Sequence, residues 1–119
     1  MARKTYKYSL NFLLKYTTDK NEKLKDLKFD LAQKKITING ETLELTGKSY
    51  DILEYLIRNN DIIITKEQLF NRIWGFESET IWSVVEVYVS NIRKTLKKYD
   101  YHIYLKTLRN VGYMWSEKE

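Results

Sequence analysis

The spacing of apolar residues changes twice along this chain, and these changes restrict its fold more than any other feature. Between Leu27 and Leu45 apolar and polar residues alternate, as in half-buried strands. From Thr46 to Leu96 the apolar residues recur at helical spacing, and alternation returns after His102. At 119 residues the chain is long enough for one domain with its own core. Strands, then helices, then a terminal hairpin predict an α+β domain.

Three short alternating runs open this domain, at residues 27–31, 35–38 and 42–45. The last two are separated by Asn39-Gly40. Both of these residues accept positive φ at little cost, so Asn-Gly between two alternating runs is a strong hairpin signal. We therefore expect an antiparallel meander of three strands.

Two helices should follow the strands, joined by the short apolar segment 62–64. Thr46 can cap the first helix, and Asn59-Asn60 is a plausible end for it. The second helix opens with the pattern of a capping box, in which Thr65 and Gln68 satisfy each other's backbone amides. That helix should end at Gly75.

Residues 80–98 predict a third helix, capped by Ser78 or Thr80, with two chemically different faces. One face is an apolar stripe of Ile81, Val85, Tyr88, Val89, Ile92 and Leu96. The other carries Ser83, Val87, Ser90, Asn91, Lys94, Lys97 and Lys98. Serine and asparagine can hydrogen-bond to base edges, while lysines suit phosphates. This face is either the solvated side of an ordinary helix or a surface that reads DNA, with an A·T-rich site because arginine is scarce.

The C-terminal part resembles a hairpin, with strands at 102–108 and 113–115 joined by residues 109–112. A hairpin placed after three helices is typical of the winged helix-turn-helix fold. In that fold a helix enters the major groove and the wing contacts an adjacent minor groove or the backbone. We expect the recognition helix at about 80–98 and the wing at about 103–115.

Composition narrows the function further. The net charge of +5 and the pI of about 9.3 favour a polyanionic partner. The chain has no cysteine and one histidine, and it has no nucleophile or phosphate-loop motif, so we expect neither an enzyme nor a metal or cofactor site. Neither a transmembrane-length apolar run nor a signal peptide is recognisable, which favours a cytoplasmic protein.

From Leu27 to Trp115 the chain resembles the effector domain of OmpR/PhoB-type bacterial response regulators of two-component systems. The resemblance rests on residues 45–46, 65–69, 73–75, 85–94 and 105–113. Of these, 85–94 is similar to the family's V-D-V-H-I-x-x-L-R-K core, and 105–113 to its wing motif ending in T-V-R-G-x-G-Y. The resemblance implies a four-stranded N-terminal sheet, a three-helix core and a hairpin wing.

Residue pattern and resemblance together give a set of candidate DNA-binding residues: Trp74, Ser83, Val87, Tyr88, Ser90, Asn91, Arg93, Lys94, Lys97, Lys98, Thr107, Arg109 and Asn110. Two of them have open alternatives. Arg93 suits a phosphate or base contact as well as a salt bridge to a nearby acid. Trp74 suits core packing better than a phosphate contact. The acidic loop 76–79 matches a region that family members can use towards RNA polymerase, and it can equally be solvated surface.

The chain also departs from the family pattern. Ser49 replaces a glutamate of the first helix, and Ser83, Ser90 and Asn91 stand where arginine is common. Tyr88 replaces a histidine. At the wing, Asn110 takes a position that usually holds glycine, which is tolerable because asparagine accepts positive φ. The family's receiver domain with its acceptor aspartate is not recognised, so the chain is either an excised or a free-standing effector domain.

We expect residues 1–26 to form an arm and linker and residues 27–117 to form the DNA-binding domain. Within the arm, Tyr6 to Tyr16 alternate as in a strand, although Leu10, Leu13 and Leu14 could also form a helical stripe. The predicted function is a sequence-specific regulator of transcription that binds double-stranded DNA, as a dimer on repeated half-sites. The alternative is a protein-interaction module of the same fold that docks a receiver domain or RNA polymerase.

Overall fold

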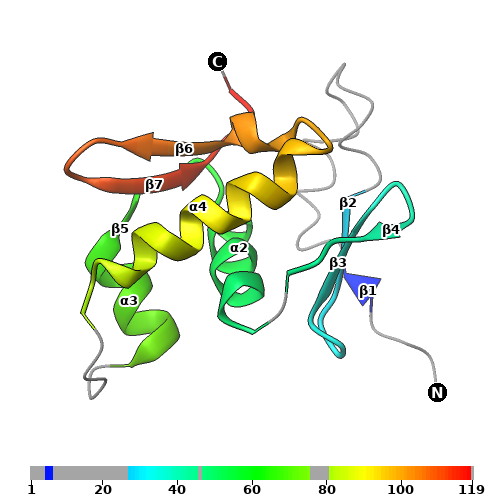
Figure 1. The fold of residues 1–119 in the computed structure, drawn as a ribbon, viewed down its shortest axis with the longest axis horizontal. Coiled ribbons are helices and arrows are strands. Elements are labelled where there is room, and N and C mark those ends of the chain that lie inside the picture. The colour runs from blue at the N-terminus through cyan, green and yellow to red at the C-terminus, as the bar shows by residue number, and fades with distance from the viewer. Residues whose placement is uncertain (1–4, 7–26, 46, 76–80, 119) are drawn as a thin grey trace.

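The computed structural model describes residues 5–6, 27–45, 47–75 and 81–118. Its strands are β1 (Thr5–Tyr6), β2 (Leu27–Asp30), β3 (Lys35–Ile38), β4 (Glu41–Thr42), β5 (Ile64–Thr65), β6 (Leu105–Leu108) and β7 (Gly112–Trp115). Its helices are α2 (Lys48–Arg58), α3 (Lys66–Trp74), α4 (Val84–Lys97) and the 3-10 helix η2 (Tyr101–Tyr104). The predicted α+β winged helix-turn-helix is confirmed (Figure 1).

An antiparallel sheet in the order β1-β2-β3-β4 opens the fold. At the β3–β4 turn Asn39 and Gly40 have φ of 54° and 84°, which confirms the hairpin expected from this dipeptide. The expected strand at 42–45 is shorter, since β4 ends at Thr42; the Leu43 amide still donates to the Ile36 carbonyl at 2.8 Å, and Leu43 and Leu45 are buried in the core. The fourth strand comes from the arm, where β1 pairs with β2. The rest of the alternating run 6–16 lies outside the described residues.

The first two helices lie close to their expected positions. Helix α2 has Gly47 as its N-cap residue, and the expected cap Thr46 lies outside the described residues. At its end the Asn59 side-chain amide donates to the Tyr55 carbonyl at 2.8 Å, which satisfies a carbonyl of the last turn. The capping box of α3 is present, with the Gln68 amide at 3.0 Å from the Thr65 hydroxyl, and the helix ends before Gly75 as expected.

Helix α4 begins at Val84, later than the expected start at residue 80. The Val84 and Val85 amides donate to the carbonyls of Ile81 and Trp82, so residues 81–83 form a turn before the helix. The prediction that Ile81 belongs to the buried apolar stripe was therefore wrong, since Ile81 is 70 % exposed. Val85 and the other residues of the stripe are buried or half-buried. Ser83 is the N-cap residue, without a capping hydrogen bond from its side chain. The expected caps at 78 and 80 and the loop 76–79 lie outside the described residues.

The expected strand from His102 was also wrong, since residues 101–104 form η2 and the strand begins at Leu105. Asp100 has a φ of 62°, and the turn it makes starts the 3-10 helix. Three residues per turn place Tyr101 and Tyr104 on one side of η2, and both are buried. Burial of two large rings at this spacing outweighs the weak alternation of the segment.

The second sheet is antiparallel, in the order β5-β7-β6. Strand β5 comes from the apolar segment 62–64, in which only Ile64 is buried while Ile62 and Ile63 are exposed. Ile64 faces Tyr113 across the ladder, and Thr65 faces Gly112. Because Thr65 also caps α3, this pairing attaches the wing to the start of that helix.

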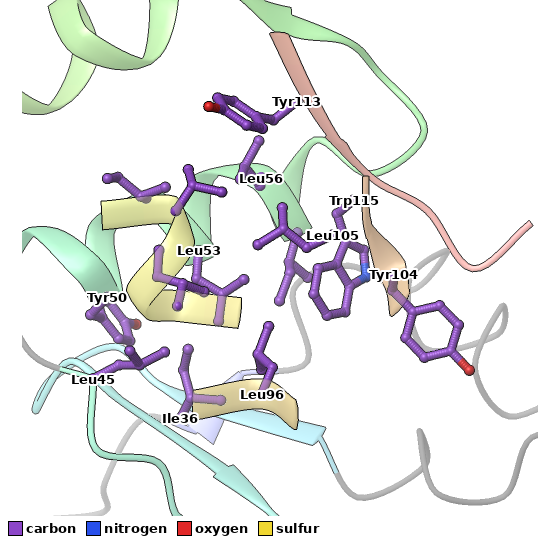
Figure 2. Packing of buried hydrophobic residues seen from close by; sticks show 14 of the residues in the cluster. Ile36, Leu45, Tyr50, Leu53, Leu56, Leu96, Tyr104, Leu105, Tyr113 and Trp115 are labelled. Atoms are coloured by element: carbon purple, nitrogen blue, oxygen red, sulfur yellow. The ribbon is translucent and has the colours of Figure 1, made fainter. Parts of the chain in front are cut away.

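One hydrophobic cluster connects both sheets with the helices, and Figure 2 shows part of it. The N-terminal sheet contributes Ile36, helix α2 contributes Leu53, and α4 contributes Leu96. The wing side contributes Leu105 and the fully buried Trp115. Shared burial fixes the orientation of α4 relative to the wing. Within the described part of the chain, no helix is both long and apolar enough to cross a membrane.

Gly112→Ala should destabilise the domain. A Cβ at this position would lie 2.1 Å from the carbonyl oxygen of Ile64, where backbone is packed against backbone. We expect a loss of about 1–3 kcal/mol, the range for forcing extra atoms into packed structure. Denaturant unfolding measures it. The control Val111→Ala, at an exposed neighbouring position, should change stability by less than about 0.5 kcal/mol. Equal stabilities for both variants would contradict the close approach of β5 and β7.

Candidate nucleic-acid interface

The face of α4 opposite the core is polar and open to solvent. Ser90, Asn91 and Lys94 are exposed, and Val87 among them is 59 % exposed. The buried stripe of Val85, Val89, Ile92 and Leu96 faces the other way. The division of the helix into two faces, and the position of Val87 outside the core, are thus confirmed. This face offers short donors and acceptors, one cation and one apolar group.

The tip of the wing is a second exposed element. Arg109, Asn110 and Val111 are exposed between β6 and β7. Asn110 has a φ of 64°, which confirms the expectation that it replaces glycine in the left-handed region. Figure 1 shows the wing alongside α4, with its tip towards the N-terminal end of that helix. Arg109 at this tip lines one groove together with Glu86 and Arg93 of α4.

Arg93 connects these two elements. Its Nε and Nη2 donate to the Leu105 carbonyl at 3.2 and 2.9 Å, and Nη2 also donates to the Thr107 hydroxyl. The guanidinium lies 6.0 Å from the Tyr113 ring centroid, at cation–π distance. Burial lowers the pKa of Arg93 and raises that of the Tyr113 hydroxyl. The sequence left a DNA contact and a salt bridge open for Arg93. Within the described part of the chain Arg93 forms no salt bridge, and its hydrogen bonds attach the wing to α4.

Trp74 and Tyr88 lie at the junction of α3 and α4. The Trp74 ring stacks on Phe70 with centroids 5.3 Å apart, and Tyr88 meets it edge-on at 5.2 Å. Lys48 lies over the same indole, with its Nζ 5.4 Å from the centroid. Trp74 is half-buried against the core, so it has the packing role that the sequence favoured. Tyr88, which is also half-buried, shares that role.

The last two lysines of the predicted surface lie at the C-terminal end of α4, near the four-stranded sheet (Figure 1). Lys97 is exposed. The Lys98 Nζ lies 3.2 Å from a carboxylate oxygen of Glu41, and this hydrogen bond raises the pKa of Lys98. Lys98 therefore already has an anionic partner, which the sequence did not indicate because 57 positions separate the two residues.

A groove of about 740 Å³ separates α4 from the wing. Its walls include Trp82, Glu86, Lys66 and the wing tip from Arg109 to Val111. Lys66 at the start of α3 pairs with the Glu86 carboxylate on α4, and the hydrogen bond raises the pKa of Lys66. Neither Trp82 nor this ion pair was among the sequence-based candidates. Trp82 lies within the predicted helix 80–98 but outside its apolar stripe, and an aromatic residue outside the stripe is the local signal that could have indicated it.

The described residues contain no cluster of three or more side chains suited to hold a metal ion. They do contain a helix with an exposed polar face, two helices that support it, and a hairpin with an exposed arginine beside it. These features define a winged helix-turn-helix domain of the nucleic-acid-binding class.

Comparison with known proteins gives the family. A family model described as "Transcriptional regulatory protein, C terminal" matches residues 40–115. The transcriptional regulatory protein CiaR of Streptococcus pneumoniae is 43 % identical over 88 residues, which are 74 % of this chain and 39 % of CiaR. The response regulator ArlR of Staphylococcus aureus is 41 % identical over 80 residues, which are 67 % of this chain and 36 % of ArlR. The chain thus spans well under half the length of these relatives.

Solved structures agree. The DNA-binding domain of the response regulator AdeR, in complex with an intercistronic region, superposes with a TM-score of 0.70 at 25 % identity, covering 78 % of this chain and 96 % of that one. For the DNA-binding domain of CpxR from E. coli the TM-score is 0.66 at 27 % identity, with coverages of 76 % and 90 %. The chain belongs to the family of C-terminal, DNA-binding effector domains of OmpR/PhoB-type transcription regulators. These are not enzymes, and the resemblance drawn from the motifs is confirmed.

Arg93→Lys should destabilise the domain although it keeps the charge. An ammonium group cannot reproduce the guanidinium's hydrogen bonds to Leu105 and Thr107. We expect a loss of about 1–2 kcal/mol, the scale of hydrogen bonds to charged groups. Denaturant unfolding measures it, with Lys94→Gln as a control on the exposed side of α4. If Arg93→Lys were as stable as the wild type and only bound DNA more weakly, Arg93 would be a direct DNA contact and not a wing fastener.

Proposed function

We propose that this chain regulates transcription in the cytoplasm by binding specific double-stranded DNA sites, with α4 in the major groove and the wing on the adjacent minor groove or backbone. The observation that carries the proposal is the exposed polar face of α4 beside a groove that α4 shares with the exposed wing tip and its Arg109. The family to which the chain belongs supports it. An isolated solvated helix would not need a neighbouring hairpin that presents an arginine.

Individual residues on this surface differ in their proposed roles. Asn91 can pair with adenine through two hydrogen bonds, and Ser90 can bond to several base edges. Lys94 and Arg109 suit phosphates, and Arg109 also suits the minor groove. Without an exposed arginine on α4 the surface lacks the commonest contact to guanine. A·T-rich sites are therefore expected.

The supporting residues take less direct roles. Arg93 and Thr107 hold the wing, Trp74 and Tyr88 hold α4 against α3, and Ser83 sits at the start of α4. Any of these can still approach a phosphate at the edge of the surface. Lys97 and Lys98 can reach phosphates only at the C-terminal end of α4. For Lys98 this requires exchanging Glu41 for the DNA backbone.

The assembly on DNA extends the proposal. Two copies would bind repeated half-sites, residues 27–117 would form the binding domain, and residues 1–26 would form an arm that adds β1 to its sheet. Loop 76–79 would be the contact for RNA polymerase. CiaR and ArlR are more than twice the length of the matched region. Control of this domain would thus come from a further domain or a partner.

Selection from randomised duplex DNA tests this function directly. We expect enrichment of one A·T-rich motif in repeated half-sites. On a single half-site, the four to six phosphate contacts expected per subunit should give log K against log salt a slope of roughly −4 to −5. Fluorescence anisotropy between low and moderate salt measures that slope. Absence of duplex binding at low salt, or an affinity that ignores salt, would rule out the proposal.

Val87→Ser should weaken binding to the selected site without affecting folding. Val87 is 59 % exposed and lies among Ser90, Asn91 and Lys94, and its methyl groups suit the thymine methyl group in the major groove. We expect about 1 kcal/mol of lost affinity, as for one mismatched base pair. The stability change should stay within about 0.5 kcal/mol.

Replacing the contacted thymine with uracil provides the matched control. It should cost the wild type as much as the substitution does and cost Val87→Ser almost nothing. If uracil affects both proteins equally at every position, Val87 contacts no thymine methyl group.

A further inference from the structure

Trp82 stands out among the side chains that the function above does not use. It belongs to the turn that leads into α4, and its carbonyl accepts the Val85 amide at 3.0 Å. Its side chain lines the groove between α4 and the wing and is 49 % exposed. Its indole N–H has no partner among the described residues. A large aromatic side chain that is exposed to solvent, and whose N–H has no hydrogen-bond partner, has the properties of an anchoring contact for a binding partner.

The groove around Trp82 offers an indole and an exposed arginine to an anionic group. Arg109 lies on its wing side, and Lys66 and Glu67 lie at the start of α3. Lys66 and Glu86 pair with each other, and Arg93 binds Leu105 and Thr107, so Arg109 is the exposed cation of this groove. The volume of about 740 Å³ lies within the ~300–1,000 Å³ of pockets that bury ligand-sized groups. A single exposed apolar residue is ordinary on a protein surface, whereas an exposed indole and an exposed arginine that line the same groove are not.

The position of the groove indicates which part of DNA would enter it. One wall is α4, which is proposed to lie in the major groove, and the other is the wing, proposed to lie on the minor groove or the backbone. The sugar–phosphate backbone is what separates these two grooves of a duplex. We propose that Trp82 binds this backbone, with its ring against a deoxyribose and its Nε1–H donating to a phosphate oxygen. The inference rests on the proposed function and names an anchor that reads no sequence.

Trp82→Ala and Ile81→Ala form a matched pair of variants. Both residues are exposed in the same turn, at 49 % and 70 %, but only Trp82 lines the groove. On duplexes that the wild type binds, Trp82→Ala should weaken affinity about tenfold, the scale of one lost hydrogen bond to a charged group. The factor should be the same for the selected site and for random duplex, because a backbone contact carries no sequence information. Ile81→Ala should bind within about twofold of the wild type, as for a surface change away from the contact.

The salt dependence separates Trp82 from the lysines and arginines. Because no charge is lost, Trp82→Ala should lower the affinity by the same factor at every salt concentration, with the slope unchanged. Arg109→Gln should instead reduce the magnitude of the slope by about one.

A set of duplexes locates the contact. Each carries one neutral methylphosphonate linkage in place of a phosphate. At one position the replacement should cost the wild type more than it costs Trp82→Phe, which keeps the ring but lacks the N–H donor. This double substitution cycle isolates the N–H–phosphate pair and uses a variant that conserves the aromatic packing.

Three results would overturn the inference. Trp82→Ala could bind like Ile81→Ala, its effect could depend on the base sequence, or no linkage could distinguish Trp82→Phe from the wild type. If Trp82→Ala fails to fold in thermal unfolding, the cycle with Trp82→Phe decides alone. Failure of the proposed function is a separate observation, since the wild type would then bind no duplex at low salt.

Discussion

Burial of one stripe on α4 is the constraint on which the rest of the structure depends. Val85, Val89, Ile92 and Leu96 are at most 1 % exposed. At about 1.5–3 kcal/mol for each fully buried aliphatic side chain, the stripe outweighs any single polar contact on the opposite face. Its burial against α2 and the wing leaves the helix little freedom to rotate about its axis. Ser90, Asn91 and Lys94 are therefore exposed as a consequence of packing on the other side.

The wing is held by contacts of a different kind. Strand β6 is the edge of its sheet, and the Arg93 guanidinium covers part of that edge by binding the Leu105 carbonyl. The other edge of β7 pairs with β5. Gly112 in β7 permits the close approach of these two strands, and Thr65 in β5 also caps α3. Wing, α3 and α4 are thus joined through few residues. This arrangement fixes the wing tip relative to the exposed face of α4, which recognition of adjacent grooves requires.

The candidate residues divide into those that present chemistry and those that position it. Val87, Ser90, Asn91, Lys94 and Arg109 project into solvent, whereas Trp74, Tyr88 and Arg93 are engaged within the fold. The family motifs contain residues of both groups and do not distinguish them, because a supporting residue and a contacting residue can lie one position apart on a helix. Arg93 and Lys94 are an example. Successive residues of an α-helix lie about 100° apart around its axis, so Arg93 attaches the wing whereas Lys94 is exposed to solvent.

Local pattern sufficed for features that depend on neighbours in sequence. The Asn39-Gly40 turn, the capping box at Thr65 and the two faces of α4 all rest on backbone preferences or on helical spacing. Pattern failed at Ile81 and His102, where a turn and a 3-10 helix replace the regular spacing next to a helix end. The Arg93–Leu105 and Lys66–Glu86 contacts and the groove beside Trp82 join segments far apart in the chain. Only packing of the whole core brings such groups together, because no local preference encodes the distance between them.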